Sequence, residues 1–313
     1  MSPAKILLDN VCELLRPADV FVCCASFESR CMSLPSRLVG FPFNKVLVCA
    51  NVNFPKVLRR EARQLQEAYR SKAELVRLNT SDPIFTADNL LLAIDRVRDA
   101  RLLIDITTFT HESLLVLLRI LKLFSIPSVD LLYATAEAYS LGDSDDRKWL
   151  SKGIGEIRSV LGYPGHALPS KKLHLIVMTG FEAERAERLI QEYEPSRISL
   201  GLGDKYDSIS LEHHRANELF HARLVEKYTS VLRFTFSLCD SAKARDELRR
   251  QAAAVSGHNT LIAPMNTKIS TVGAALLGME DETVQLCYAT ANQYNEKAYS
   301  SPGKECYYFN VRL

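Results

Sequence analysis

The feature that most constrains the fold of this chain is an internal duplication. The segment YATAEAY, Tyr133 to Tyr139, recurs 155 residues later as YATANQY, Tyr288 to Tyr294, with five of the seven positions identical. Two further pairs keep nearly the same spacing: SFESR at 26–30 with GFEAER at 180–185, and TTFTHES at 107–113 with PMNTKIS at 264–270. A period this long far exceeds that of solenoid repeats, so it indicates two copies of a whole domain.

Within each copy, short apolar runs alternate with longer stretches of helical periodicity. The apolar runs are DVFVCCAS, KVLVCAN, AELVRL, RLLIDIT and SVDLLYAT in the first copy, and LHLIVMTG, SRISLGLG, SVLRFTFSL, NTLIAPM and TVQLCYAT in the second. Strands that alternate with helices form parallel sheets, and strands that are apolar throughout are covered on both faces. The sequence therefore predicts an α/β fold: a tandem duplication of a Rossmann-like, mostly parallel three-layer αβα unit.

Each copy is predicted to end with one further strand. KGIGEIRSVL in the first copy corresponds to PGKECYYFNV in the second, and no helix follows either segment, so we expect each to add antiparallel to a sheet edge. The linker is placed at 164–172, in PGHALPSKK, which gives Rossmann-like repeats over 1–165 and 172–313. The run from Asp143 to Lys148 is expected to form a solvated loop.

Composition excludes several classes of protein. A chain of 313 residues with 47% hydrophobic and 24% charged residues is typical of a globular protein with two domains. A net charge of +2 is too small to indicate duplex DNA binding, although it is compatible with a small anionic ligand. The chain has no signal peptide and no apolar run long enough to span a membrane, so we expect it to stay in the cytoplasm. No CxxC pair or ligand-like spacing indicates a metal site.

The first pair of recurring segments follows the first strand of each copy, where ligands bind in open parallel sheets. Free backbone N–H groups at such a turn could hold an anion. The phenylalanines could equally pack beneath the turn, and the glutamates could cap the next helix. The candidate ligand-binding residues here are Ser26, Phe27, Glu28 and Arg30, with Gly180, Phe181, Glu182 and Arg185.

The second pair follows the fourth strand of each copy. A hydroxyl beside a cationic or titratable side chain at a helix N-terminus suits a phosphate group. The threonines could instead serve as N-caps. The candidates are Thr107, Thr110 and His111, with Asn266, Thr267 and Lys268. After the fifth strand, Tyr139 and Tyr294 could stack on a base, or could pack on the neighbouring turn.

Catalysis would need an acid or base, and three carboxylates are candidates: Asp105, Glu28 and Glu182. Asp105 lies inside the apolar run LLIDIT, where a buried carboxylate needs a partner or a raised pKa. It could also cap the threonine turn. The sequence contains neither GxGxxG nor GxxxxGK[ST], so no cofactor is predicted.

The Thr-rich, Lys-containing turn after the fourth strand, together with the first-strand turn, resembles the CARF ligand-binding domains. The related SAVED domains resemble two CARF units in tandem. The resemblance implies a cyclic oligonucleotide second messenger bound at these two turns, and a role in prokaryotic antiviral defence. The family's turn reads Thr-Gly-Gly-Thr-Lys, whereas this chain has TTFTH with His111 in place of Lys in the first copy, and PMNTK in the second.

Three functions are consistent with these features. The first is a sensor in which Lys268, His111, Arg30 and Arg185 bind phosphate and the output passes to a separate effector protein or to homo-oligomer assembly. The second is an enzyme that cleaves a phosphodiester or N-glycosidic bond of a nucleotide. The third is a scaffold subunit of a multiprotein complex.

Overall fold

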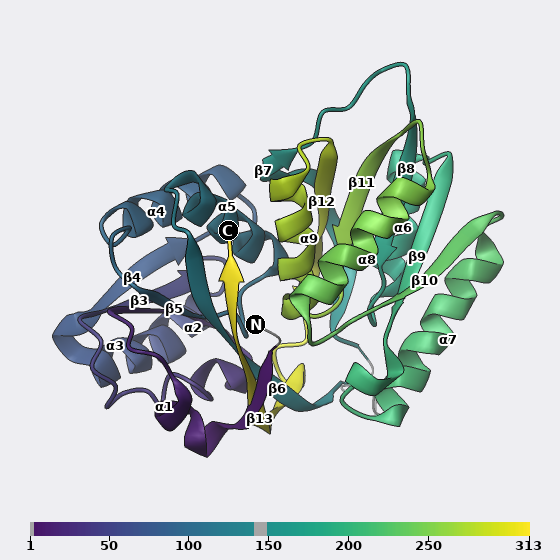
Figure 1. Cartoon of the computed structure of the whole chain (residues 1–313). Helices are drawn as coiled ribbons and strands as arrows, with labels where there is room; N and C mark the ends of the chain where they lie inside the picture. Colours follow the sequence, from purple (N-terminus) through teal and green to yellow (C-terminus); the bar gives the residue numbers. More distant parts are fainter. Residues whose placement is uncertain (1–2, 141–148) are drawn as a thin grey trace. The chain divides into compact units, whose positions relative to one another are not determined.

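The structure is a computed structural model that describes residues 3–140 and 149–313, so the expected loop at Asp143 to Lys148 lies outside the described residues. The chain forms two compact units (Figure 1). Unit 1 comprises Met1–Tyr139 and Glu296–Leu313, and unit 2 comprises Ser140–Asn295. Unit 1 is therefore built from two segments that are far apart in the sequence.

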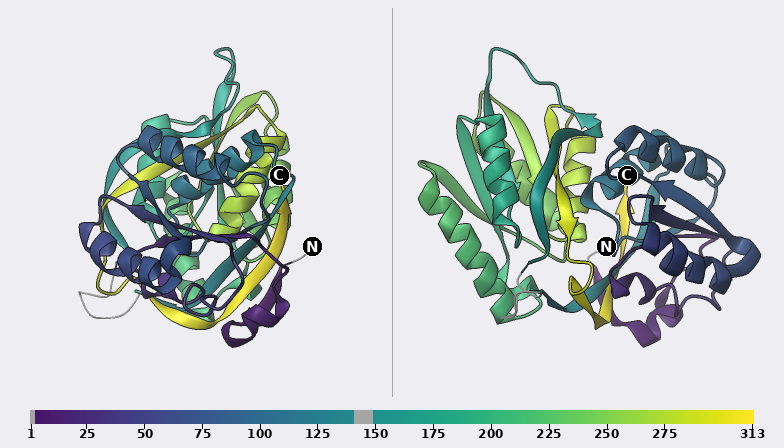
Figure 2. Two further views of the ribbon diagram at one scale, coloured as in Figure 1. Left: turned by 90° about the vertical axis from the view of Figure 1, so that its left-hand side faces the viewer. Right: turned by 180° about the vertical axis from the view of Figure 1, so that it is seen from behind.

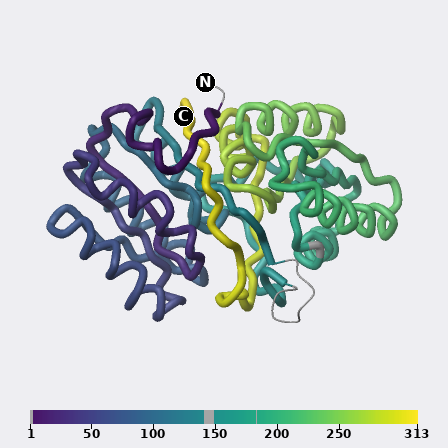
Figure 3. The backbone as a smooth tube through the Cα atoms, turned by 90° about the horizontal axis from the view of Figure 1, so that it is seen from below, coloured from purple at the N-terminus to yellow at the C-terminus, as the bar shows by residue number. Residues whose placement is uncertain are grey.

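Within the described residues, unit 1 has a seven-stranded sheet in the order β4-β3-β2-β5-β6-β13-β1. The strands β2 to β6 are parallel, β13 pairs antiparallel with β6, and β1 pairs antiparallel with β13. Figure 3 shows the C-terminal strand, in yellow, running beside the N-terminal strand, in purple. The bounds are β1 Ala4–Leu7, β2 Val20–Ala25, β3 Lys45–Asn51, β4 Ala73–Leu78, β5 Leu102–Asp105, β6 Ser128–Tyr139 and β13 Ser300–Arg312.

Helices cover both faces of the unit 1 sheet. On one face, Leu65 and Tyr69 of α3 join a core with Phe21 and Phe43, whose rings stack with centroids 5.1 Å apart. On the other face lie α4 and the strongly apolar α5 (Figure 1). The helical segments and turns are η1 Leu8–Asn10, α1 Val11–Leu14, η2 Ser29–Met32, α2 Pro55–Val57, η3 Leu58–Ala62, α3 Arg63–Tyr69, η4 Arg70–Lys72, α4 Pro83–Asp95 and α5 His111–Leu123.

Unit 2 repeats this plan with six strands in the part of the chain that the structure describes, in the order β10-β9-β8-β11-β12-β7. The strands β8 to β12 are parallel, and β7 pairs antiparallel with β12. The bounds are β7 Ser151–Pro164, β8 Lys172–Met178, β9 Arg197–Gly203, β10 Val231–Phe236, β11 His258–Pro264 and β12 Val284–Tyr294.

Among the residues of unit 2 that the structure describes, two helices lie on each face of the sheet. Leu189 of α6 and Leu224 of α7 share a core with Leu175, Val177 and Leu261 of the sheet. Figure 2 shows α6 and α7 in front of the sheet when the unit is seen from behind, and Figure 1 shows α8 and α9 on the opposite face. The helices and turns are α6 Ala183–Tyr193, η6 Lys205–Asp207, α7 Leu211–Lys227, α8 Ser241–Ala254 and α9 Lys268–Glu280.

The predicted fold class is confirmed: each unit is a mostly parallel α/β sheet with an antiparallel strand beyond its fifth parallel strand. Counted from β2 in unit 1 and from β8 in unit 2, the five parallel strands have the order 3-2-1-4-5, which is also the order of the first five strands of the Rossmann fold. The internal duplication seen in the sequence is thus a duplication of topology.

The units differ from the predicted domains 1–165 and 172–313 because the last strand of each copy joins the sheet of the other copy. The strand β7, which ends copy one, completes the sheet of unit 2, and β13, which ends copy two, completes that of unit 1. We call β7 and β13 the exchanged strands. The predicted linker at 164–172 consequently connects β7 to β8 within unit 2.

The repeated YATA motif is the surface on which an exchanged strand docks. The Thr135 hydroxyl donates to the Glu305 carbonyl at 2.9 Å, and Thr290 Oγ1 accepts from the Glu156 N–H at 2.8 Å. A Cβ on Gly303 would lie 2.5 Å from Thr135 Oγ1, and one on Gly155 would lie 2.5 Å from Thr290 Oγ1. Glycine is therefore required where each exchanged strand passes its threonine.

Candidate functional site

The strand order reverses between β2 and β5 in unit 1 and between β8 and β11 in unit 2, which is where ligands bind in this fold. Hydrogen bonds bridge the two turns at this point. In unit 1 the Thr108 hydroxyl donates to the Cys24 carbonyl at 2.5 Å. In unit 2 the Asn266 carboxamide donates to the Thr179 carbonyl. The carboxyl ends of the central strands are thus held together in both units.

Gly180 takes the place in unit 2 that Ser26 takes in unit 1, and the structure explains the difference. A Cβ on Gly180 would lie 2.4 Å from the Met265 carbonyl oxygen, which is backbone and cannot move aside cheaply. In unit 1 the Ser26 hydroxyl instead accepts a hydrogen bond from the Glu28 N–H at 3.3 Å. Gly180 is therefore needed for close packing of the two turns in unit 2.

Arg30 lies in a buried cluster of unit 1 and is only 3% exposed. Its guanidinium donates to Glu28 Oε2 at 2.7 Å, to Ser300 Oγ at 3.1 Å and to the Ala134 carbonyl at 3.2 Å. Its Cζ also lies 5.4 Å from the ring centroid of Tyr139. Burial alone would lower the pKa of Arg30, but the Glu28 carboxylate and the nearby tyrosines raise it above its usual value. Arg30 stays charged inside the protein because its partner is buried with it.

Unit 2 contains the same cluster. Arg185, 6% exposed, lies 3.2 Å from Glu182 Oε2 and donates to Ser151 Oγ at 3.0 Å. The Ser151 hydroxyl also contacts Glu182, and the Arg185 guanidinium lies 6.0 Å from the ring centroid of Tyr294. Ser151 and Ser300 are the first residues of the exchanged strands. In both units the Glu–Arg pair therefore contacts the strand that the other copy supplies.

Four of the predicted site residues form ion pairs in these clusters. Glu28 and Glu182 form ion pairs with Arg30 and Arg185, so both carboxylates and both guanidinium groups are already matched in charge. Removing one partner of a buried pair of this kind is strongly destabilising, because the other charge is then buried without compensation. The sequence pattern SFESR and GFEAER is explained by this pairing, whatever else these residues contact.

The phenylalanines after Ser26 and Gly180 pack against other aromatic rings. The Phe27 centroid lies 5.4 Å from that of Phe54 and 5.7 Å from that of Tyr299. The Phe181 ring lies 5.9 Å from the His213 imidazole, edge to face. Offset and edge-to-face geometries are those that aromatic pairs prefer. The packing alternative raised by the sequence is therefore the arrangement that the structure contains.

Thr110 and Thr267 are N-caps, of α5 and α9 respectively. Each hydroxyl accepts from the N–H three residues on, at 3.1 Å: Ser113 in unit 1 and Ser270 in unit 2. The helices then begin with His111 and with Lys268, both half-buried. The first turn of α5 includes the acidic residue Glu112, whereas the first turn of α9 has none. The two helix N-termini are equivalent in position but differ in charge.

Asp105 ends β5 and is 2% exposed. It accepts hydrogen bonds from the Thr107 N–H, at 3.0 Å, and from the Thr107 hydroxyl. Burial raises the pKa of Asp105 to about 6, although the Thr107 hydrogen bonds and the Arg30 charge act to lower it. Thr107 Oγ1 in turn accepts from the Ala134 N–H at 2.9 Å, and the Ala134 carbonyl accepts from Arg30. Thr107, which binds Asp105, and Arg30 therefore bind the N–H and the carbonyl of the same residue of β6.

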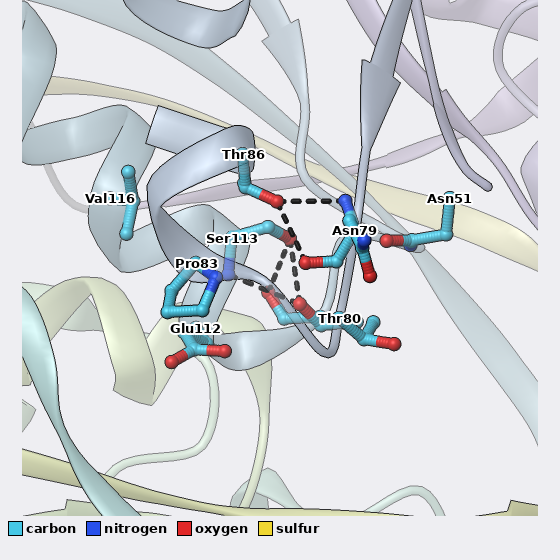
Figure 4. Close-up of a pocket in the computed structure, with 9 residues that line it drawn as sticks. Asn51, Asn79, Thr80, Pro83, Thr86, Glu112, Ser113 and Val116 are labelled. Carbon is cyan, nitrogen blue, oxygen red and sulfur yellow. Dashed lines mark hydrogen bonds between the residues drawn. The ribbon is translucent and has the colours of Figure 1, made fainter. Parts of the chain in front are cut away.

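A polar pocket opens in unit 1 at the carboxyl ends of β3 and β4 (Figure 4). It encloses about 220 Å³ of space not filled by atoms, part of it open to solvent. The N-termini of α4 and α5 form two of its sides. Of the predicted site residues, Thr110 lines it. The pocket lies on the β3 side of the switch point, away from the Arg30 cluster on β6.

Several residues of these sites were missed by sequence reasoning. Ser151 and Ser300 carry a weak signal, since each precedes a glycine in the segment that ends its copy. Asn51 and Asn79, which line the pocket, each stand at or just after the end of an apolar strand, where a polar residue is a usable signal. Neither asparagine recurs in the second copy, so the repeated motifs do not include them.

Among the described residues, no group of three or more His, Cys, Asp or Glu side chains could hold a metal ion. In the same ranges, no helix has the length and apolar character that crossing a bilayer requires.

No protein-family model matches the chain, and no curated protein matches it significantly. Solved structures similar to it include the cytoplasmic domain of a prokaryotic cation chloride cotransporter, at 11% identity and a TM-score of 0.25 over 91% of this chain and 98% of that one. Another is a wide-type short-chain dehydrogenase/reductase from Veillonella parvula in complex with NADP, at 8% identity and a TM-score of 0.25 over 89% and 98%. A functionally unknown protein from Pseudomonas aeruginosa is similar at 9% identity and a TM-score of 0.26 over 89% and 93%. TM-scores this low carry no argument, so the fold class rests on the strand order.

Proposed function

We propose that the protein is a sensor that binds a nucleotide-type ligand through phosphate groups at the carboxyl ends of the strands in its Rossmann-like units. The observation that carries this proposal is the N-terminus of α9. There, Lys268 directly follows the N-cap Thr267, beside the switch point of unit 2, in a first turn without an acidic residue. The helix dipole and the ammonium group favour the same anion at this position.

Unit 1 offers a weaker version of the same feature. Its helix α5 begins with His111 in the place of Lys268, and Glu112 follows in the first turn. An anion bound there would be repelled by the glutamate carboxylate. We therefore assign the main phosphate site to Lys268 and a secondary one to His111.

Each of these two helix N-termini suits a phosphate group of its own, which favours a phosphate-bearing ligand for each unit. A nucleotide with more than one phosphate, cyclic oligonucleotides included, presents several anionic groups. The resemblance of the two turns to CARF and SAVED domains favours a cyclic oligonucleotide, a separate effector protein and a role in prokaryotic antiviral defence.

The second candidate function is an enzyme. The surroundings of the three possible acid residues decide between the enzyme and the sensor. Glu28 and Glu182 are held in ion pairs with buried arginines, and Asp105 is enclosed with Thr107. A general acid or base must reach the proton that it transfers. The sensor is preferred because all three carboxylates are already engaged by partners within the protein.

The proposal is tested by calorimetric titration and thermal melting of the full-length protein. The panel contains AMP, ATP, pyrophosphate and cyclic di-, tri- and tetranucleotides. We expect at least one phosphate-rich member to bind and raise the melting temperature. Since a charge-assisted hydrogen bond contributes about 1.5–3 kcal/mol, Lys268→Ala should weaken binding roughly ten- to hundredfold.

Lys172→Ala is the matched control, because it removes the same charge from the opposite, amino end of β8 in the same unit. Its affinity should equal that of the wild type. Mass spectrometry of the recovered ligand separates the two candidate functions: intact ligand supports the sensor, and cleaved ligand supports the enzyme. Unchanged binding in Lys268→Ala, or no binding to folded protein by any member of the panel, would overturn the proposal.

A further inference from the structure

The strand β10 lies at an open end of the unit 2 sheet. Among the described residues it pairs only with β9, so the backbone N–H and C=O groups directed away from β9 have no strand to bond. Figure 1 shows β10 as the outermost strand of this sheet. An edge of this kind is a template for another strand, because each of these backbone groups can extend the ladder. The occupant that fits it is therefore a β-strand.

The other sheet ends are protected in ways that β10 is not. The strand β1 has only four residues. The edge strand β4 carries Glu74, which pairs with Lys45 and Arg96. The strand β7 is interrupted by register shifts against β12. Short strands, charges and bulges are the usual protection of a sheet edge. In contrast, β10 is a regular strand of six residues, VLRFTF, with Arg233 as its one charged side chain.

The aromatic side chains of β10 leave its outer edge uncovered. Phe234 and Phe236 are both buried, with ring centroids 6.1 Å apart. A Cβ on Gly201 of β9 would lie 2.5 Å from the Phe234 ring and 2.9 Å from the Phe236 ring. Both rings therefore fold inward over β9, which holds β10 in its sheet. Leu232, in contrast, is 41% exposed.

A further apolar side chain is exposed beside the carboxyl end of β10. The Asp207 carboxylate of η6 accepts hydrogen bonds from the Ser237 hydroxyl and, at 3.0 Å, from the Leu238 N–H. These bonds fix η6 next to the end of the strand. Tyr206, in the same turn, is 90% exposed. Tyrosine is enriched in protein interfaces, so this surface suits a protein partner.

The sequence of β10 is self-complementary in one antiparallel register. When two identical strands pair about a two-fold axis, opposite residues lie on the same face, so the axis passes through a residue. The axes that keep most of the strand paired pass through Arg233 or Phe234. An axis at Arg233 would set two arginines against each other, which is unfavourable. An axis at Phe234 sets Arg233 opposite Thr235, both exposed. The same axis sets Leu232 opposite Phe236, apolar against apolar.

We propose that two molecules of this protein associate through β10, which pairs antiparallel with β10 of the second molecule about a two-fold axis at Phe234. The pairing joins the two unit 2 sheets into one continuous sheet, with Arg233 of each molecule opposite Thr235 of the other. The proposal rests on the edge of unit 2 alone and does not depend on phosphate binding at Lys268.

The test is analytical ultracentrifugation of the full-length protein over a range of concentrations. We expect a monomer–dimer equilibrium that responds in opposite directions to opposite charges at position 235. Thr235→Lys sets a like charge against Arg233 twice in each dimer, so it should weaken association roughly two- to thirtyfold. Thr235→Glu sets an opposite charge at the same place and should strengthen association by a similar factor.

Further variants tie the result to this register. The double variant Arg233→Glu/Thr235→Lys restores opposite charges and should associate more tightly than Thr235→Lys alone. Ser170→Lys and Ser170→Glu place the same charges at an exposed residue between β7 and β8, and both should associate as the wild type. Hydrogen exchange measured by mass spectrometry needs no variant: the β10 amides should exchange more slowly as the protein concentration rises.

The proposal fails if the protein stays monomeric at every concentration, which would leave a strand of another protein as the occupant of the edge. It also fails if a dimer forms but Lys and Glu at position 235 shift its dissociation in the same direction or not at all. A dimer whose β10 amides exchange as fast as those of the monomer would likewise exclude this pairing.

Discussion

Arg30 and Arg185 occupy equivalent positions in the two units, and each is buried beside a glutamate and a serine. The recurrence of these arginines was visible in the sequence, but their partners were not. The serines Ser300 and Ser151 come from strands that lie far away in the chain, and no local pattern connects them to the arginines. At the scale of single residues, sequence comparison therefore identified the residues that matter and left their contacts open.

Asp105 has no counterpart in unit 2, where the apolar Ala263 holds the corresponding position of β11, and its burial has a consequence for stability. The pKa of Asp105 is raised from 3.8 to about 6 by burial. The folded state then holds this proton more tightly than the unfolded state. Its contribution to stability is fully present below pH 3.8 and is lost as the pH rises through about 6.

We expect the free energy of unfolding of the wild type, relative to that of Asp105→Asn, to fall by about 2 kcal/mol between pH 4 and pH 7, since one pKa unit corresponds to about 1.4 kcal/mol and the unfolded carboxyl group is already partly ionised at pH 4. Urea titrations at several pH values give this difference directly. Asp99→Asn, on an exposed aspartate, should show no such trend. A difference that stays constant or increases with pH would contradict the assignment.

At the scale of elements, the alternation of strands and helices could be predicted because it depends on the local pattern of apolar and polar residues. The stretch from Phe54 to Arg70 forms the run α2, η3 and α3, and the apolar runs of both copies form the parallel strands β2–β6 and β8–β12. The short strand β1, AKIL, was missed because four residues with a polar lysine do not stand out as a strand. Its position depends on pairing with β13, which is a long-range contact.

The N-caps of α5 and α9 offer a test that separates capping from ligand binding. Thr110→Ala and Thr267→Ala each remove the side-chain oxygen that accepts from the third residue of the helix. Each should lower the free energy of unfolding by about 1 kcal/mol. Thr→Ser at either position keeps the oxygen and should recover most of the loss. Chemical denaturation measures both effects without ligand, and a Ser variant no more stable than its Ala counterpart would count against the capping role.

At the scale of the whole molecule, the exchange of β7 and β13 is the feature that was not predicted from the sequence. The last parallel strands of the two sheets, β6 and β12, present the same YATA surface, and the segment that ends each copy can dock on it with a glycine beside the threonine. The repeat itself makes the two pairings equivalent in local chemistry. Local sequence patterns therefore do not distinguish the exchanged pairing from the pairing within each copy.

If β7 and β13 are exchanged, a change in β13 should affect unit 1 and a change in β7 should affect unit 2. An arrangement in which each copy keeps its own last strand predicts the opposite. Val311 in β13 and Val160 in β7 are both buried, at 4% and 1% exposure, and either change to alanine should cost about 2 kcal/mol. Val311→Ala, near the C-terminus, should increase hydrogen exchange most in β6 of unit 1, because Val311 pairs with Val129 there. Val160→Ala, in the first copy, should act most on β12 of unit 2, beside Cys287.

Hydrogen exchange measured by mass spectrometry resolves the two strands, and a loss of about 2 kcal/mol corresponds to roughly thirtyfold lower protection. Each variant is the control for the other. If Val311→Ala instead loosened β12 and Val160→Ala loosened β6, each copy would be keeping its own last strand and the exchange would be wrong.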